Sequence, residues 1–172
     1  MPSAFGKPVT TANRFGVVVA AGASYALISG GTAGTITTSW TTRTIDTEVY
    51  DASAIVSIAA NAFTLIAGTY LITAVTGCRG PLSGGAFFQA VAIRLRNTTD
   101  STTVSEGCTF GGSDLSSVSR WSPAGSVSLS TVTTIASAKT FEIQNIVPSV
   151  DVQGGAAEQT PRHVIVTITK IA

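Results

Sequence analysis

Residues 61–77, "NAFTLIAGTYLITAVTG", are the most strongly patterned stretch of this 172-residue chain. Turn-forming residues bound the stretch, and apolar and polar side chains alternate within it. Successive side chains of a strand point to opposite sides, so Tyr70, Ile72 and Ala74 share one face. The stretch contains no carboxylate, basic side chain or thiol. It therefore predicts a structural element and not a reactive site.

Alternation with a period of two residues recurs along the chain, and no segment shows a sustained helical period. Gly, Ser, Asn, Asp and Pro separate the alternating segments, as turns require. The pattern predicts an all-β fold, either a β-sandwich or an antiparallel jelly roll. "NTTD", residues 97–100, is predicted to be a tight turn. The other expected strands lie in 36–49, 54–58, 87–96, 101–109, 126–135, 139–147 and 162–172.

Composition narrows the class of protein. Hydrophobic residues make up 44% and charged residues 11% of the chain, and the formal net charge is +1. This balance lacks the basic surface that nucleic-acid binding needs, and no apolar run is long enough for membrane insertion. The apolar run Val17–Ala21 is also too short for a secretory signal. We expect a soluble protein made in the cytoplasm.

The first residues are patterned differently from the rest. "SGGTAG", residues 29–34, has the composition of a flexible connection between better-patterned segments. The sequence therefore predicts an extended N-terminal arm or adaptor over 1–35 and a globular head over 36–172. Arms of this kind often become ordered only against a neighbour.

The quoted stretch resembles the C1q/TNF-like head signature, in which an aromatic residue precedes a short apolar step, Gly-x-Tyr and a strand. The matching positions are Phe63, Gly68 and Tyr70. "VAIRLRNTT" and "HVIVTITKI" are similar to a later strand and to the closing central strand of that family. The resemblance covers residues 40–172, favours the jelly-roll β-sandwich and implies a trimeric, non-enzymatic C1q/TNF-like head.

Two features depart from the family pattern. The turn that often carries Gly-Asp is "ASAK" at 136–139, and neither a collagen-like nor a coiled-coil stalk precedes the head. The Ser/Thr/Gly-rich surface and short arm are more similar to C1q-like modules of bacteriophage virion proteins. The resemblance thus implies a virion structural protein, assembled in the host cytoplasm. The form expected is a trimeric capsid decoration or head-spike protein docked through its arm. Alternatives are a tail-fibre tip or receptor-binding module, and a secreted bacterial lectin or adhesin.

The sequence predicts no enzyme, metal or cofactor site. His163, the single histidine, adjoins a strand and has no G-x-S-x-G nucleophile partner, which favours a strand-edge or interface role. Asp46 and Glu48 share a strand face, but a solvated or subunit-facing surface is favoured over glycosidase chemistry. Cys78 and Cys108 fit no zinc spacing, and they are either buried thiols or a disulfide formed in an oxidising medium.

Two sets of residues are candidates for contacts with partners. The loop "SDLSSVSRWSPAG" contains a candidate binding segment for a capsid protein, a tail protein, or a host-surface glycan or protein. Alternatively, its tryptophan packs back over the sandwich. The residues of this first set are Arg120, Trp121, Ser122 and Pro123. The second set is Arg94, Arg96 and Glu106, which either lie on solvated outer strand faces or form a subunit contact. Asn97 begins a glycosylation sequon, which matters only for a secreted protein.

Overall fold

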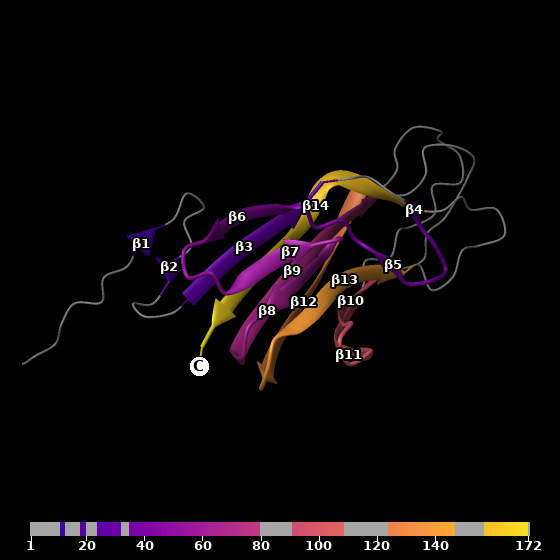
Figure 1. Ribbon diagram of the computed structural model, residues 1–172. Coiled ribbons are helices and arrows are strands. Elements are labelled where there is room, and N and C mark those ends of the chain that lie inside the picture. Colours follow the sequence, from indigo (N-terminus) through magenta and orange to yellow (C-terminus); the bar gives the residue numbers. More distant parts are fainter. Residues whose placement is uncertain are drawn as a thin grey trace, which may run out of the picture.

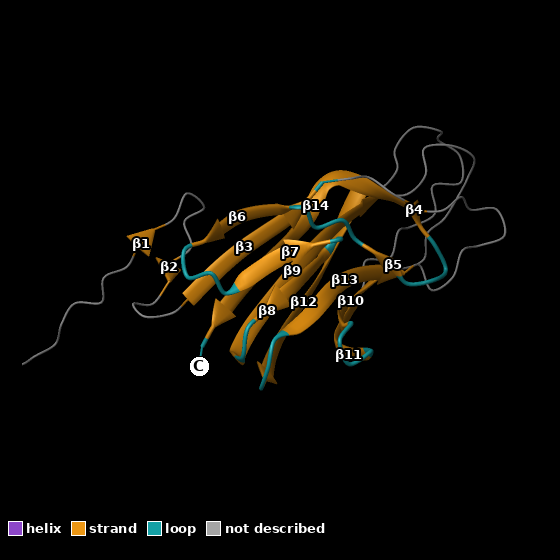
Figure 2. Cartoon of the chain, in the orientation of Figure 1, coloured by secondary structure: helices purple, strands orange, loops and turns teal. Residues whose placement is uncertain are grey.

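A computed structural model describes residues 11–12, 18–19, 24–31, 35–79, 91–108, 124–146 and 157–171. Within these ranges the protein is built from β-strands and short connections, with no helix (Figure 2). Accordingly, the described residues include no helix that is long and apolar enough to cross a membrane. The prediction of an all-β fold is confirmed.

Figure 1 labels the strands in chain order. In order they are β1 (Thr11–Ala12), β2 (Val18–Val19), β3 (Ser24–Gly30), β4 (Thr35–Ile36), β5 (Thr41–Thr42), β6 (Thr47–Asp51), β7 (Val56–Ala59), β8 (Ala62–Leu65), β9 (Gly68–Arg79), β10 (Ala92–Asn97), β11 (Thr102–Cys108), β12 (Ala124–Ile135), β13 (Lys139–Ile146) and β14 (Ala157–Lys170).

Two antiparallel sheets form the sandwich. Sheet I has the order β12-β9-β14-β3-β6, with β4 paired to β14. Sheet II has the order β11-β10-β13-β8-β7, with β5 paired to β13. Most neighbours in each sheet are distant in sequence, which is the connectivity of a jelly roll and not of a meander.

The core lies between the sheets and is made by the inward half of each alternating segment. Phe63 of sheet II is fully buried and stacks on Phe141, with ring centroids 5.7 Å apart. The predicted inward faces of the long strands are confirmed, since alternate residues are buried. The fully buried core side chains include Ala26, Ile28, Ile36, Leu65, Tyr70, Ile72, Ala74, Val91, Ile93, Leu95, Ile143, Val166 and Ile168.

The stretch 61–77 connects the two sheets. Its first part forms β8 in sheet II and its second part forms β9 in sheet I. Gly68 begins β9 with a φ of 156°, a conformation that glycine adopts at least cost. The Tyr70 hydroxyl donates a hydrogen bond to the carbonyl of Ile66 at 2.8 Å, which ties the strand to the turn before it. Burial, with a smaller effect of Asp51, raises the pKa of Tyr70.

The segment 36–49, predicted as one strand, is divided among both sheets. β4 pairs with β14 of sheet I, β5 with β13 of sheet II, and β6 with β3 of sheet I. The chain therefore passes between the sheets after β5, which buries Arg43 and Ile45. Gly30 permits this passage, because a Cβ there would lie 1.7 Å from the carbonyl oxygen of Thr44. A local pattern of β-branched residues cannot reveal such a change of sheet.

The boundary predicted after residue 35 is corrected by β3. Ser24–Gly30 lies inside sheet I, where Val166 of β14 faces Ile28 and Asp51 of β6 faces Ala26. This segment belongs to the head, because its alternating side chains complete the core. Residues before Ser24 are described only at β1 and β2, which pair with each other. An arm formed by 1–23 stays a prediction.

Candidate functional site

The outer face formed by β9, β12, β14 and β3 of sheet I is called here the uncharged face. Its side chains are the outward halves of β9, β12, β14 and β3, and they carry hydroxyl, aliphatic or phenol groups. Hydroxyls pair across strands: Thr73 lies 3.2 Å from Ser130, and Thr69 lies 3.0 Å from Thr134. None of its described side chains is charged. They are Tyr25, Leu27, Ser29, Thr69, Leu71, Thr73, Val75, Ser126, Ser128, Ser130, Val132, Thr134, Ile165, Thr167 and Thr169.

Large apolar side chains are exposed on the uncharged face. Val132 is 60% exposed, Ile165 46% and Leu71 38%. Val132 lies directly across from Leu71, and Ile165 across from Val75, so the apolar groups form cross-strand pairs. A flat surface with paired aliphatic groups and no charge can be covered by protein at little desolvation cost.

The outer face of sheet II is called here the charged face, and a hydrogen-bond network organises it. Arg94 Nε donates to Gln144 Oε1 at 2.8 Å, and Gln144 Nε2 donates to Glu142 Oε2 at 2.8 Å. The Thr42 hydroxyl of β5 donates to the same Glu142 oxygen at 3.0 Å. The network thereby joins β10, β13 and β5 on the outside of the sandwich.

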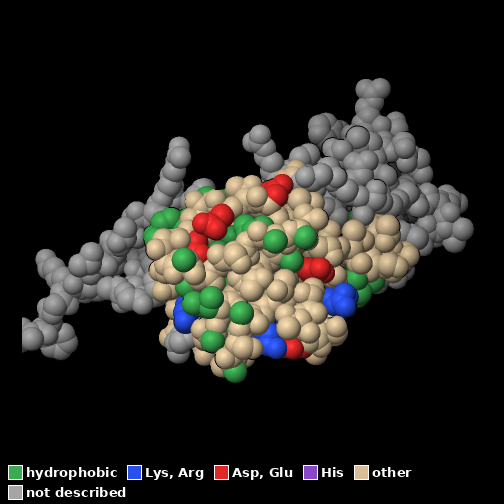
Figure 3. All heavy atoms as spheres, in the orientation of Figure 1, with side chains coloured by type: hydrophobic (Ala, Val, Ile, Leu, Met, Phe, Trp, Pro, Cys, Tyr) green, Lys and Arg blue, Asp and Glu red, His purple; other side chains and the backbone are tan. Residues whose placement is uncertain are grey.

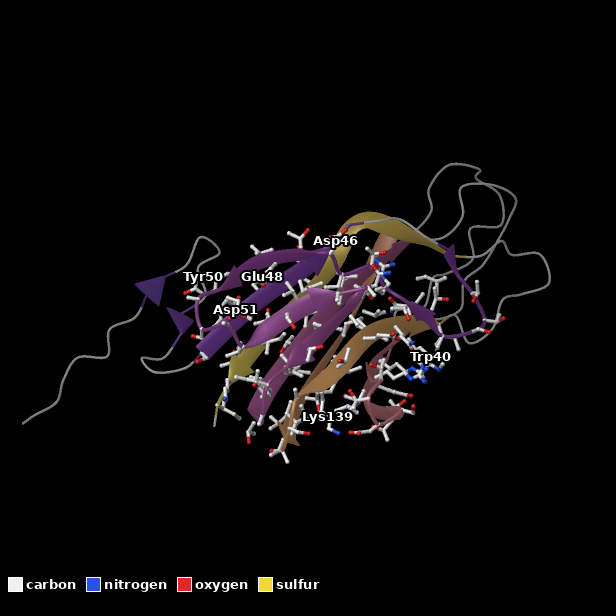
Figure 4. The ribbon with its side chains drawn as sticks, viewed as in Figure 1. Trp40, Asp46, Glu48, Tyr50, Asp51 and Lys139 are labelled. Carbon is white, nitrogen blue, oxygen red and sulfur yellow. The ribbon has the colours of Figure 1, made fainter. Side chains whose placement is uncertain are left out.

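Trp40 lies just before β5 (Figure 4), and its ring contacts Arg94 at one end of this network. The Arg94 guanidinium lies 4.2 Å from the centroid of the Trp40 ring, a cation–π distance. Burial and the neighbouring Arg96 lower the pKa of Arg94, while Glu106 and Glu142 oppose this shift. The guanidinium remains charged, and its orientation is set by Gln144 and Trp40.

The predicted set of Arg94, Arg96 and Glu106 is brought together on the charged face. Arg94 faces Glu106 across β10 and β11, while Arg96 faces Thr103. The described contacts of Arg94 go to Gln144, Trp40 and Thr103. A subunit contact through these three residues stays a prediction.

The far end of β13 carries a second polar cluster. Lys139 Nζ donates to Asp100 Oδ1 at 2.6 Å, and Asn97 Nδ2 donates to Asp100 Oδ2 at 2.9 Å. The Asp100 backbone N–H in turn donates to Asn97 Oδ1 at 3.0 Å, which closes the turn predicted at 97–100. Asn97 is 6% exposed. The folded turn therefore keeps the amide of the sequon out of reach of a modifying enzyme.

Several sequence candidates fall outside the described side chains. These include the whole candidate binding segment, Arg120, Trp121, Ser122 and Pro123, and the side chains of Cys78, Cys108 and His163. Asp46 and Glu48 are exposed on and beside β6. Among the side chains that the structure describes, no three His, Cys, Asp or Glu gather closely enough to hold a metal ion.

Sequence reasoning missed Trp40, Gln144 and Glu142 as parts of one site. Trp40 stands alone among Thr and Ser in "TTSWTTR", and nothing local assigns it to sheet II. Thr42 and Gln144 are 102 positions apart, and only the register of β5 on β13 makes them neighbours. The single sequence signal for this site was that Glu142 and Gln144 alternate with apolar residues, which places both side chains on the outer face of one strand.

Comparisons with known proteins identify the fold. No family model matches the sequence, and no curated protein sequence matches it either. Among solved structures, the globular domain of zebrafish complement 1qA protein is 14% identical with a TM-score of 0.52. The similarity covers 85% of this chain and 94% of that domain.

Two further solved structures are similar. Murine APRIL at pH 5.0 has a TM-score of 0.57 at 8% identity, covering 87% of this chain and 99% of that one. Eiger TNF from S. frugiperda has a TM-score of 0.58 at 10% identity, covering 87% and 93%. The chain therefore has the C1q/TNF-like jelly-roll fold that Phe63, Gly68 and Tyr70 suggested.

Proposed function

We propose that this protein is a trimeric, non-enzymatic structural protein of a bacteriophage virion. In this proposal the head is a capsid decoration or head-spike domain, and residues before β3 attach it to the particle. The observation that carries the trimer is the uncharged face of sheet I. A second copy can cover this face without burying an unpaired charge, which is the costliest event at an interface.

The difference between the two outer faces supports an oriented assembly. The charged face holds Arg94, Arg96, Glu106 and Glu142, groups whose burial in a subunit interface would be expensive. The uncharged face holds Val132, Ile165 and Leu71, which lose little on leaving water. Copies therefore assemble through sheet I and present sheet II outward.

Placement on a virion is supported by the sequence. The Ser/Thr/Gly-rich composition resembles that of C1q-like modules of phage particles. The proposal of a non-enzymatic head is supported by the C1q/TNF-like fold that the chain shares with its structural neighbours. A binding assay with intact particles, using the full chain and one lacking 1–23, tests attachment. Equal binding of both forms contradicts docking through the N-terminal segment.

Matched substitutions on the two faces test the trimer. Thr73→Asp places a charge in the uncharged face, while Thr64→Asp places one at a comparable position on sheet II, where Thr64 lies 2.8 Å from Thr140. Sedimentation at micromolar concentration should give three chains for the unmodified protein and for Thr64→Asp. Thr73→Asp should give single folded chains, since a buried unpaired charge costs ~3–5 kcal/mol. A trimer that tolerates Thr73→Asp contradicts this interface.

A receptor-binding module is the second candidate, favoured by the stacked Trp40 and Arg94 on the charged face. Aromatic and arginine side chains are enriched where binding energy concentrates. Trp40→Ala and Trp121→Ala, assayed for attachment to host cells, distinguish this function from a purely structural one. Unchanged adsorption in both variants leaves the decoration protein as the conclusion.

A further inference from the structure

β6 has a free strand edge and an unusual composition for this chain. It stands at the end of the sheet I order, and among the described residues only β3 pairs with it. Val49 is 41% exposed and Tyr50 44% exposed, so the edge is apolar as well as open. An exposed edge strand is a template for another strand, which proteins normally protect.

The rim along β6 is acidic. Figure 4 shows Asp46, Glu48 and Asp51 along this strand, and Figure 3 shows acidic side chains grouped over the same rim. Asp51 is engaged, because it accepts hydrogen bonds from the N–H groups of Ile55 and Val56 at 3.1 and 2.8 Å. Asp46 and Glu48 are exposed. Two β6 edges would repel each other, so the strand that pairs here must be neutral or basic.

The N-terminal segment has the complementary charge. Residues 1–45 contain no Asp or Glu, and Lys7 and Arg14 are the charged side chains before β3. The run Phe15–Ala21, "FGVVVAA", also contains three consecutive valines, which favour a strand. Charge and strand preference therefore both match the β6 edge.

The β1–β2 pair also lacks a sheet to stabilise it. Its two strands pair with each other through Thr11 with Val19 and Ala12 with Val18, and with no other described strand. In Figure 1 the pair stands apart from the sandwich, beyond the ends of β3 and β6. A two-stranded hairpin is marginal in water by itself, so it gains most from joining a larger sheet.

The geometry points to an exchange of this hairpin between copies: β2 of one subunit adds to the β6 edge of a neighbouring subunit. Within one chain, residues 20–23 join β2 to β3, and β3 begins beside Asp51 at the end of β6. A β2 placed on β6 of its own chain would therefore run parallel to it, whereas the described strand pairs of sheet I are all antiparallel. A neighbouring copy can supply the antiparallel orientation. The inference rests on the proposed trimer and adds a second contact to it.

A photocrosslink between isotopically distinct copies tests the exchange. p-Benzoylphenylalanine replaces Tyr50 in the full chain, and ¹⁴N and ¹⁵N copies are unfolded together and refolded as mixed trimers. We expect illumination to join position 50 to residues 11–19, with mixed isotopes in the linked peptides. The same probe in place of Ile66, which is 47% exposed at the β8–β9 turn, should not capture residues 11–19.

Charge variants sharpen the result. Glu48→Lys in the probe-bearing chain should lower the capture roughly twofold to fivefold, the equilibrium effect of one exposed charge pair. Adding Arg14→Glu should restore it, and Glu106→Lys on the charged face should change nothing. Three sedimenting chains with no capture, or with capture inside one copy, overturn the exchange alone. A full chain that sediments as a monomer overturns the proposed trimer as well.

Discussion

Thr73 on sheet I and Thr64 on sheet II occupy comparable outer positions, and each pairs with a hydroxyl on the adjacent strand. Their surroundings differ. The residues around Thr73 are uncharged, whereas the outer face that includes Thr64 continues along β13 to Glu142 and its partner network. One alternating pattern thus produces two chemically distinct faces. The outward charges of β10, β11 and β13 share sheet II, whereas the described outward side chains of β9, β12, β14 and β3 in sheet I are uncharged.

The proposed trimer uses this difference between the two faces, although charged residues make up only 11% of the chain. On sheet II, Gln144 joins Arg94 to Glu142 by hydrogen bonds, so these two outward charges have polar partners at the surface. Outward hydroxyl and aliphatic groups on sheet I have neighbours on their own sheet, and Val132, Ile165 and Leu71 among them are exposed. The first face is suited to solvent, the second to another copy.

The largest effect on folding is expected from the removal of β3, one of the strands that form the uncharged face. Deleting 1–35 takes away β3, including the fully buried Ala26 and Ile28, and exposes the edge of β14. We expect no cooperative thermal unfolding by circular dichroism, since the core loses one of its strands. Deleting only 1–23 should leave a folded head. A cooperatively folding 36–172 fragment would show that β3 is dispensable.

The next largest effect is expected from truncating a buried side chain in the core between the two sheets. Phe63→Ala removes a fully buried ring that stacks on Phe141, which should lower the free energy of unfolding by ~3–5 kcal/mol. Tyr70→Phe removes only the hydrogen bond to Ile66 and should cost ~1 kcal/mol. Chemical denaturation of both variants measures the difference. Equal losses would contradict the assignment of the ring and the hydroxyl to separate roles.

A smaller effect is expected where the two sheets meet at β11 and β12. A Cβ on Gly107 would lie 2.2 Å from the carbonyl oxygen of Ser128, so Gly107→Ala must push β11 away from β12. We expect a loss of ~1–3 kcal/mol, the usual cost of overpacking. Ser105→Ala in the same strand is the control and should be nearly silent in thermal denaturation. A neutral Gly107→Ala would mean that the sheets separate freely at this edge.

The charged face should respond weakly to loss of its aromatic cover. Trp40→Ala removes the cation–π contact with Arg94 and should cost about 1 kcal/mol. Sedimentation of this variant should still give three chains, because Trp40 lies on the opposite face from the proposed interface. Dissociation of Trp40→Ala would assign the interface to sheet II and reverse the comparison.

The smallest effect concerns acid stability at the end of β13. The Lys139 ammonium, which donates a hydrogen bond to Asp100, holds the pKa of this carboxyl below its ordinary value. A depressed folded-state pKa stabilises the fold above the unfolded pKa, and this contribution is lost as the pH falls through the folded value. Asp100→Asn should therefore flatten the pH dependence of the melting temperature below about pH 4. An unchanged acid profile would contradict this assignment.

Much of the fold could be predicted from local pattern, and the failures share one cause. The inward positions of β9, β10 and β14 followed from alternation alone, because a strand's faces depend only on neighbouring residues. β3 was assigned to an arm because the Gly-rich stretch after it resembles a linker. In the fold, Gly30 is needed there so that Thr44 can pass close to the strand.

The sequence by itself determined that the chain forms strands, which of their residues turn inward, and that 61–77 resembles a C1q/TNF-like head. Only the tertiary structure decided which strands share a sheet. It therefore decided that Trp40 meets Arg94, that Gln144 joins Arg94 to Glu142 on sheet II, and that β6 pairs only with β3 among the described residues. Alternation is a property of adjacent residues. Sheet membership depends on pairing between residues far apart in sequence, such as Gln144 with Thr42, 102 positions apart, and Lys170 with Ser24 at the two ends of the head. No local pattern encodes such a partner.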